Sequence, residues 1–244
     1  MKAMILAAGI GERLYPITKN IPKCMVDIGG KPLIEHQINW LRDNGIKEIA
    51  INLYHLPEKI TEFLGNGSKL GVKIRYSHEK KLMGTAGGVK RIDDFFDDLF
   101  MVYYGDEYTN LNLSELERYH KSKNAFMTLC VREKSAGSKE SNIIRLNGDN
   151  QISEFVEKPS KEQTKNLNIP NMTNCGIYLC NMKILEKIPQ DSFYDFGKDV
   201  LPNLVKKEKI YGFMIPEKYY WYELGKLEKY ERLKPEIEKI LTSQ

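Results

Sequence analysis

Residues 4–13 read Met-Ile-Leu-Ala-Ala-Gly-Ile-Gly-Glu-Arg, an apolar run that stops at two glycines one residue apart. The run predicts a buried strand over residues 4–8 that ends at Gly9. Two glycines at a strand end let backbone N–H groups approach an anion closely, and Arg13 and Lys23 are placed to neutralise its charge. Taken alone, the same pattern fits a glycine turn with surface charges equally well.

Two familiar phosphate-binding motifs are absent from this turn. The dinucleotide-binding fingerprint needs a third glycine at the position of Leu14, and the Walker loop needs a Gly-Lys-Ser/Thr sequence that does not follow the glycines. The turn therefore predicts an anion site of another kind.

Short apolar runs alternate with amphipathic segments along the chain. Strands are expected at residues 4–8, 48–53, 72–76 and 99–104, and helices at residues 32–44, 57–64, 85–95 and 113–122. Further strands are expected at 125–132, 142–146, 152–157 and 176–181, and further helices at 196–205 and 226–241. We predict a single-domain α/β fold, Rossmann-like, with a mixed, mostly parallel sheet and helices on both faces.

The last helical segment carries an apolar stripe. Its members, at helical spacing, are Leu227, Tyr230, Leu233, Ile237 and Leu241. We expect this stripe to pack on the core, with a partner helix as the less favoured alternative.

The composition excludes several protein classes. Among 244 residues, 41% are apolar and 29% are charged, as in an ordinary globular domain. The 37 basic and 33 acidic residues form no basic block, which argues against a nucleic-acid partner. Because no run approaches the ~20 apolar residues of a membrane span and no leader is recognisable, we expect a cytoplasmic protein with no membrane partner.

Cysteine and histidine spacing gives no metal-site pattern. The four cysteines include no CxxC pair, and the four histidines have no ligand-like spacing. We expect reduced, buried thiols rather than a zinc site.

A series of motifs follows the N-terminal turn in a defined order. They are Pro22-Lys23, Lys31-Pro32-Leu33-Ile34, Leu82-Met83-Gly84-Thr85-Ala86-Gly87, Tyr104-Gly105-Asp106, Phe155-Val156-Glu157-Lys158-Pro159, Asn174-Cys175-Gly176-Ile177-Tyr178, Asp195-Phe196-Gly197-Lys198-Asp199 and Trp221-Tyr222-Glu223-Leu224-Gly225. Together they resemble the sugar-1-phosphate nucleotidyltransferases, and most of all the short mannose-1-phosphate guanylyltransferase-like members.

The resemblance implies a reaction and a domain plan. A nucleoside triphosphate and a sugar 1-phosphate would give a nucleotide sugar and pyrophosphate, in the service of nucleotide-sugar and polysaccharide biosynthesis. Residues 1–225 would form the nucleotidyltransferase domain, with 1–122 mainly binding nucleotide and 123–225 mainly binding sugar phosphate. Residues 226–244 would form a C-terminal helix packed on it, and the resemblance leaves a homo-oligomer open.

The resemblance also implies roles for charged residues. Arg13 would hold the departing pyrophosphate, Lys23 the α-phosphate and Lys158 the incoming sugar phosphate. Asp106 and Glu223 would be ligands of a Mg²⁺ cofactor, so the catalytic set is Arg13, Lys23 and Asp106. The alternative interpretation of Asp106 is a helix cap or a solvated charge. The alternative interpretation of Glu223 is a surface glutamate.

Base and sugar recognition are assigned by the same resemblance. The nucleotide would lie against Leu6, Ala7, Ala8, Gly9, Gly11, Arg13, Lys23, Glu79, Gly84, Thr85 and Ala86. The sugar phosphate would lie against Gly105, Asn142, Glu157, Lys158, Asn174 and Gly176. Glu79 would accept hydrogen bonds from a guanine edge, or would be a solvated glutamate beside two lysines, and the glycines near residue 84 would make room for a ligand.

Two departures from the family pattern keep alternatives open. Glu223 stands where relatives usually carry an aspartate, and Ser141-Asn142 stands where they carry an aromatic residue and glycine. We predict a GTP-dependent enzyme for a mannose-type or heptose-type sugar. The alternatives are a nucleotide-sugar-binding regulatory protein without turnover, or a cytidylyl-, uridylyl- or thymidylyltransferase with another phosphate acceptor; Gly84-Thr85-Ala86 counts against a phosphocholine-type acceptor.

Overall fold

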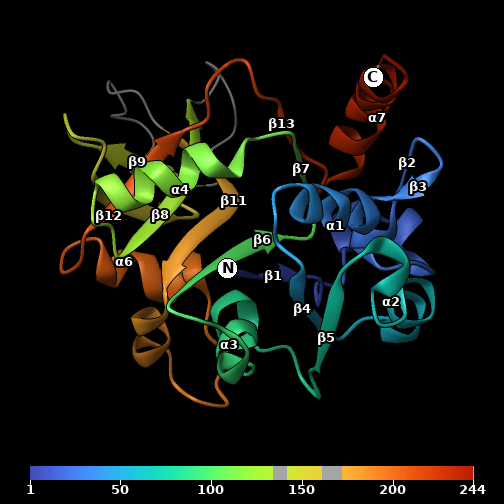
Figure 1. The fold of residues 1–244 in the computed structure, drawn as a ribbon, viewed down its shortest axis with the longest axis horizontal. Coiled ribbons are helices and arrows are strands. Elements are labelled where there is room, and N and C mark those ends of the chain that lie inside the picture. Colours follow the sequence, from blue (N-terminus) through green and yellow to red (C-terminus); the bar gives the residue numbers. More distant parts are fainter. Residues whose placement is uncertain (134–141, 161–171, 244) are drawn as a thin grey trace. The chain divides into compact units, whose positions relative to one another are not determined.

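A computed structural model describes residues 1–133, 142–160 and 172–243 (Figure 1). The chain forms two compact units that are interleaved along the sequence. The first unit holds residues 1–82, 103–111 and 218–244, and the second holds residues 83–102 and 112–217.

The first unit is built on three parallel strands. In it, β4 (Glu48–Leu53) lies between β1 (Lys2–Leu6) and β5 (Lys73–His78), with Leu6 opposite Asn52 and Asn52 opposite Ser77. Nearly every residue of β4 is buried, as expected for a parallel strand covered on both faces. Because the carboxyl ends of parallel strands meet at one edge, Leu6 and Leu53 lead into neighbouring loops there.

Short elements complete this unit. Its helices are α1 (Leu33–Asp43), α2 (Pro57–Leu64) and α7 (Leu227–Thr242). Its two antiparallel ribbons pair β2 (Asp27–Ile28) with β3 (Lys31–Pro32) and β7 (Glu107–Thr109) with β13 (Trp221–Glu223). Its 3-10 turns are η1 (Glu12–Leu14), η2 (Ile17–Lys19), η3 (Lys23–Met25) and η4 (Ser68–Leu70).

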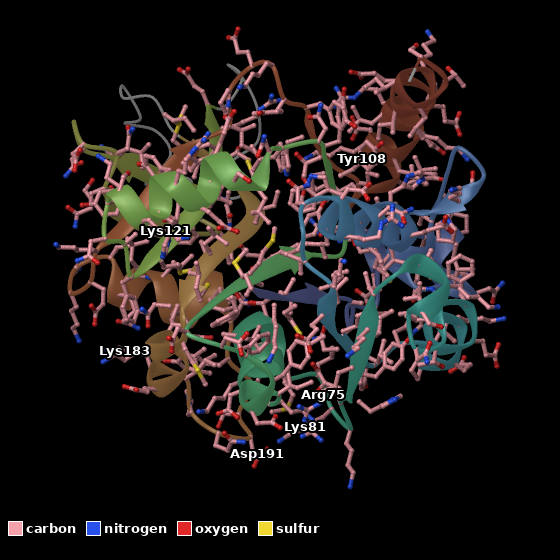
Figure 2. The ribbon with its side chains drawn as sticks, viewed as in Figure 1. Arg75, Lys81, Tyr108, Lys121, Lys183 and Asp191 are labelled. Atoms are coloured by element: carbon pink, nitrogen blue, oxygen red, sulfur yellow. The ribbon has the colours of Figure 1, made fainter. Side chains whose placement is uncertain are left out.

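Helix α7 packs on the core of the first unit. Tyr230 and Ile237 are buried in a cluster with Leu14, Val26 and Tyr108, and Leu233 and Leu241 pack against it. Tyr108, labelled in Figure 2, also stacks on Tyr220 with ring centroids 5.4 Å apart. The predicted core role of the apolar stripe is confirmed for these residues.

The second unit has a mixed sheet. In it, β8 (Met127–Glu133) lies between a parallel β12 (Ile210–Met214) and an antiparallel β11 (Met172–Asn181), and β6 (Leu99–Tyr104), which runs on into the first unit, lies beside β11. A separate antiparallel ribbon pairs β9 (Asn142–Leu146) with β10 (Ile152–Glu157). The helical elements are α3 (Gly84–Lys90), η5 (Asp93–Phe95), α4 (Leu113–Ser122), η6 (Met182–Lys187), the π-helix η7 (Phe196–Val200) and α6 (Leu201–Leu204).

Most predicted elements are present, with differences at their ends. Strand β1 begins and ends two residues before the predicted limits, because the apolar side chains of Ala7 and Ala8 belong to the turn that follows it. The helix predicted over residues 85–95 ends at Lys90 and continues as a 3-10 turn, and the one over 196–205 begins as a π-helix. Strand β12 is not among the strands that the sequence predicts.

No helix among the described residues is long and apolar enough to cross a membrane. The four cysteines are buried and free, as predicted.

Helix α4 supplies a test of stability against pH. His120 is buried beside Thr128, with Nδ1 2.9 Å from the hydroxyl, and burial lowers its pKa to about 4. The unfolded chain, with an ordinary histidine pKa near 6.5, therefore binds a proton first as pH falls, so stability is lost from about pH 6.5 down to about pH 4.

We expect His120→Asn to retain about 2–3 kcal/mol more of its unfolding free energy than the wild type between pH 7 and pH 4. Urea titrations at pH 7, 5.5 and 4 measure this difference. An exposed-residue control on the same helix, Arg118→Asn, should follow the wild type. Parallel pH curves for His120→Asn and the wild type would contradict the assignment.

Candidate active site

The two glycines of the turn after β1, Gly9 and Gly11, have different surroundings. Gly11 has a left-handed φ of 78°, and a Cβ there would lie 3.1 Å from Lys23 Cβ and 3.2 Å from Thr18 Cβ. The Thr18 hydroxyl donates to the Gly11 carbonyl at 2.7 Å. Gly9 is exposed, with no atom within 4 Å of a Cβ there. Gly11 thus allows η3 to pack close, whereas Gly9 leaves the loop open to an approaching group.

Lys23 and Asp106 form an ion pair across this turn. Their side chains are 18% and 13% exposed, so the predicted alternative of a solvated carboxylate does not apply. Burial alone would raise the pKa of Asp106, but the charge and hydrogen bond of Lys23, with a smaller effect of Arg13, outweigh it and lower that pKa. Asp106 is therefore ionised.

A second carboxylate meets the first above Gly225. A Cβ added to Gly225 would lie 2.5 Å from Asp106 Oδ2, 2.9 Å from Glu223 Oε1 and 2.9 Å from Lys23 Nζ. The Glu223 side chain is 21% exposed and pairs with Lys229 on α7. The missing side chain at Gly225 is what lets these charges gather.

Glu107 adds a buried acid beside the pair. It lies opposite Glu223 in the β7–β13 ribbon, is 4% exposed, and its Oε2 has no hydrogen-bond partner in the described part of the chain. Burial and the neighbouring charges of Asp106 and Glu223 raise the pKa of Glu107 well above its usual value. The raised pKa disfavours a third negative charge in the site.

The donor set fits a hard divalent cation held partly by substrate. Asp106 and Glu223 supply carboxylate oxygens within 3 Å of one point. Among residues 1–133, 142–160 and 172–243, no group of three or more acidic, histidine or cysteine side chains is arranged to hold a metal. Two carboxylates without a full protein cage match the way Mg²⁺ binds, with phosphates and water completing its shell.

Arg13 lies near this centre and is exposed. Its guanidinium makes no hydrogen bond or ion pair with any residue that the structure describes, although its charge reaches Asp106. An exposed, uncommitted guanidinium is suited to bind phosphate oxygens.

Glu79 is buried, not solvated. It is 7% exposed, so the alternative of a solvated glutamate beside two lysines does not describe it. Its Oε1 accepts a hydrogen bond from the Asn52 amide at 2.7 Å, and Asn52 in turn accepts from the Ala7 N–H at 2.8 Å. The carboxylate is thus connected to the loop that follows β1.

Gly105, at the end of β6, is explained by packing within the first unit. Its N–H donates to the Leu6 carbonyl at 3.0 Å, and a Cβ there would lie 2.6 Å from that same oxygen. A side chain at Gly105 would collide with the Leu6 carbonyl. It would therefore push β1 away from Asp106, the residue that follows Gly105.

In the second unit, the start of α3 packs on the segment before η7. A Cβ on Gly84 would lie 2.4 Å from the Tyr194 carbonyl oxygen, and one on Gly87 2.5 Å from that of Ser192. The Ala86 and Gly87 N–H groups already donate to Tyr194, and the Thr85 hydroxyl donates to Asp195. In the structure, these two glycines make room for the backbone of Ser192 and Tyr194.

The predicted sugar-side residues cluster around β10, β11 and η7. The Glu157 carboxylate lies against Gly197, whose added Cβ would be 3.0 Å from Oε2. Asn174 donates to the Tyr178 hydroxyl at 2.6 Å and accepts from the Gly176 N–H, within a bulge of β11 where Gly176 has a φ of 65°. Such bulges are common beside active sites.

Two further residues that we predict to bind the sugar phosphate are Asn142 and Lys158. Asn142 is buried at 5% exposure, and Lys158 has a left-handed φ of 50°. Ser141, the other half of the Ser141-Asn142 departure, lies outside the described residues.

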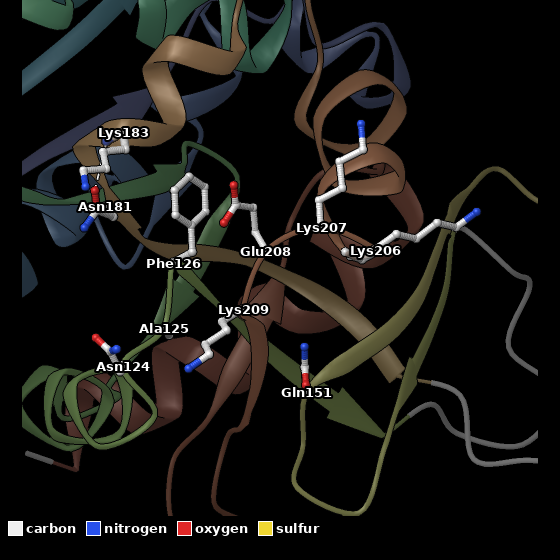
Figure 3. A pocket seen from close by; sticks show the side chains of 11 residues that line it. Asn124, Ala125, Phe126, Gln151, Asn181, Lys183, Lys206, Lys207, Glu208 and Lys209 are labelled. Carbon is white, nitrogen blue, oxygen red and sulfur yellow. Dashed lines mark hydrogen bonds between the residues drawn. The ribbon is translucent and has the colours of Figure 1, made fainter.

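A cavity of about 530 Å³ in the second unit lies elsewhere. Its lining includes Asn124, Gln151, Asn181 and Glu208, with Lys183, Lys206, Lys207 and Lys209 (Figure 3). The side chains of Lys206 and Lys207 extend in different directions in Figure 3. None of the predicted site residues lines this cavity, and its lysines are exposed.

Comparison with known proteins identifies the family. A model described as "Nucleotidyl transferase" matches residues 2–240. The chain belongs to the nucleotidyl transferase family. It is 35% identical to the UTP--glucose-1-phosphate uridylyltransferase of Synechocystis sp., aligned over 94% of the chain and 61% of that protein. It is 33% identical to probable mannose-1-phosphate guanylyltransferase 1 of Oryza sativa subsp. japonica, over 92% of the chain and 61% of that protein.

A solved structure supports the same fold. The crystal structure of HddC from Yersinia pseudotuberculosis superposes with a TM-score of 0.80 at 25% identity, covering 96% of this chain and 98% of that one. A second structure of HddC, complexed with GMP-PN, superposes with a TM-score of 0.78. The predicted fold class and the resemblance to sugar-1-phosphate nucleotidyltransferases are confirmed. The chain spans 61% of the length of the two curated relatives.

The sequence patterns missed two residues that the structure places in contact with candidate site residues: Asn52, beside Glu79, and Lys229, beside Glu223. Asn52 is the one polar residue in the apolar run Ile49-Ala50-Ile51-Asn52-Leu53, and that interruption was a usable signal. Lys229 follows Glu223 by six residues across a turn, and no spacing rule links them.

The contact of Gly84 with Tyr194 yields a stability prediction. Gly84→Ala places a Cβ 2.4 Å from a backbone oxygen and forces alanine into a φ of 74°. We expect a loss of at least about 2 kcal/mol of unfolding free energy, measured by urea denaturation. Gly148→Ala, with no atom within 4 Å of its Cβ, is the matched control. Equal stability of the two variants would show that residues 192–194 do not pack there.

Proposed function

We propose that this nucleotidyltransferase joins a nucleoside triphosphate to a sugar 1-phosphate, with GTP as the preferred donor and a mannose-type or heptose-type sugar. A phosphate oxygen of the sugar 1-phosphate attacks the α-phosphorus in line, the bond from the α-phosphorus to its bridging oxygen breaks, and pyrophosphate leaves. The convergence of Lys23, Asp106 and Glu223 above Gly225 is the observation that carries the proposal.

Nucleotidyl transfer needs alignment and charge neutralisation more than covalent chemistry. Lys23 would hold the α-phosphate, exchanging part of its contact with Asp106 for the substrate. Arg13, exposed and uncommitted, would bind the departing pyrophosphate with its planar fork. Asp106 and Glu223 would hold Mg²⁺, which when bound supplies positive charge for the phosphate oxygens.

The second unit would supply the acceptor side. Lys158 would bind the phosphate of the sugar 1-phosphate, and Glu157 would accept hydrogen bonds from sugar hydroxyls. A Cβ on Gly197 would crowd the Glu157 carboxylate at 3.0 Å, so the glycine leaves this carboxylate room in its present position. Asn142, Asn174 and Gly176 of this unit would complete the subsite. The resemblance assigns Gly105, a residue of the first unit, to the same substrate.

The roles proposed for the chain segments divide the sequence after residue 122. Residues 1–122 would bind mainly nucleotide and 123–225 mainly sugar phosphate, with residues 226–244 as the closing helix. The base would meet the loop of Leu6 to Gly11, Glu79, and the segment Gly84-Thr85-Ala86. The Ala86 N–H already donates to Tyr194, so a contact between the base and Ala86 would use other atoms of that residue.

GTP and UTP are the two donors that the relatives support. The Oryza relative is named for guanylyl transfer and the Synechocystis relative for uridylyl transfer. We favour GTP because Glu79 presents a buried carboxylate, and guanine offers adjacent N1–H and N2–H donors to such an acceptor.

One panel assay tests the proposal. Pyrophosphate release is measured with Mg²⁺ across four nucleoside triphosphates and a set of hexose and heptose 1-phosphates, and nucleotide-sugar binding is measured in parallel by calorimetry. We expect turnover with GTP and at least one sugar 1-phosphate. Tight nucleotide-sugar binding without turnover for any pair would favour the regulatory alternative instead, and turnover with UTP alone would reassign the donor.

Lys23→Ala tests the charge at the α-phosphate. We expect kcat to fall by about 10²–10³-fold, because the lost ammonium acts on charge that develops in the transition state. Steady-state kinetics and thermal melting measure activity and folding separately. Lys19→Ala, on the neighbouring turn η2 and exposed, is the control, and it should retain wild-type kcat. A similar fall in both variants would remove Lys23 from the reaction.

Glu223→Gln tests the second carboxylate. The change keeps the side-chain size and removes the charge, so we expect about a tenfold higher Mg²⁺ concentration for half-maximal activity and weaker Mn²⁺ binding in electron paramagnetic resonance. Glu228→Gln, exposed in the first turn of α7, controls for charge loss. An unchanged metal dependence would mean that Glu223 is held by Lys229 alone and is no ligand.

A further inference from the structure

A buried amide connects two loops of the first unit. Asn52 is 3% exposed near the end of β4, the middle of the three parallel strands. Its Oδ1 accepts from the Ala7 N–H at 2.8 Å, directly after β1, and its Nδ2 donates to Glu79 Oε1 at 2.7 Å, directly after β5. The Asn52 side chain therefore links the residue that follows β1 to the residue that follows β5.

The backbone determines which way this amide faces. The Ala7 N–H can only donate, so the Asn52 oxygen must face it and the Asn52 nitrogen must face Glu79. Glu79 is thereby required to present an acceptor to Asn52. The Glu79 N–H also donates to the Leu53 carbonyl at 2.8 Å, so the main chain of residue 79 is tied to the strand that carries Asn52.

We propose that Asn52 is a specificity-determining residue, because it sets the hydrogen-bonding character of residue 79 toward the base. The inference rests on the proposed function, since it takes Glu79 as the side chain that meets the donor base. With Asn52 donating to Oε1, the other atom of a glutamate is an acceptor, Oε2. With Asn52 donating to a glutamine, Oε1 is used and the other atom is an amide nitrogen, a donor.

This reasoning predicts a reversal when both residues are changed. The carboxylate that Asn52→Asp introduces has two acceptor oxygens. One can still accept from the Ala7 N–H, and the other can accept from the amide nitrogen that Glu79→Gln introduces. The remaining polar atom of the new amide is then its oxygen, an acceptor as in the wild type. In the single variant Asn52→Asp, the new carboxylate would face the Glu79 carboxylate in a buried place, where two like charges disfavour each other.

The experiment measures GTP and UTP binding by calorimetry without sugar phosphate, together with kcat/KM for both donors. We expect Glu79→Gln to lower the ratio of GTP to UTP affinity about tenfold or more, because the acceptor for the guanine donors becomes a donor. Asn52→Asp with Glu79→Gln should restore the ratio to within about threefold of the wild type. Glu48→Gln, exposed at the other end of β4, should not change it.

The outcomes separate this inference from the function on which it rests. A ratio that Glu79→Gln leaves unchanged overturns the inference, because Glu79 then does not read the base. A ratio that falls in Glu79→Gln and stays low in the folded double variant also overturns it, while the base-reading role of Glu79 stands. Restored GTP binding without turnover in the panel assay supports the inference and rejects the enzymatic function.

A further single variant, Asn52→Ala, tests the inference if the double variant does not fold. Asn52→Ala removes the amide that fixes Glu79, so the ratio of GTP to UTP affinity should fall while thermal melting still shows a folded protein. A folded Asn52→Ala protein with the wild-type ratio would contradict the role assigned to Asn52.

Discussion

The ion pair between Lys23 and Asp106 is the contact around which the site is organised. It joins residues 83 positions apart in the sequence, and it keeps a largely buried carboxylate ionised. Burial alone would favour the protonated acid. The left-handed turn at Gly11 brings η3 close enough to supply the lysine, and the missing side chain at Gly225 leaves room for both groups.

Charge balance around this pair suits a polyanionic substrate. Each candidate metal ligand already faces a lysine, Asp106 with Lys23 and Glu223 with Lys229, and burial raises the pKa of the nearby Glu107 well above its usual value. Isolated charges in such a place would be costly, because desolvation penalises each of them. Paired charges can instead exchange partners when phosphate and a cation arrive together.

Several glycines of the family motifs have packing roles that their spacing does not reveal. Gly84 and Gly87 accommodate the backbone of residues 192–194, and Gly105 accommodates the Leu6 carbonyl. The motifs therefore mark places where two backbone segments touch, as well as places that a ligand approaches. Sequence alone cannot distinguish these cases, because both require the absence of a Cβ.

The sequence by itself determined the local structure and the family. Hydrophobic periodicity placed the elements at residues 48–53, 57–64, 99–104 and 113–122 with their observed limits, because burial on a strand or helix repeats at a fixed period. Tertiary structure alone decided the partners of the charged and polar side chains. The burial of Glu79 against Asn52 and the pairing of Glu223 with Lys229 depend on how strands and helices meet in space. No local pattern encodes them, because a side chain's hydrogen-bond partner and dielectric surroundings come from segments that are brought together only by folding.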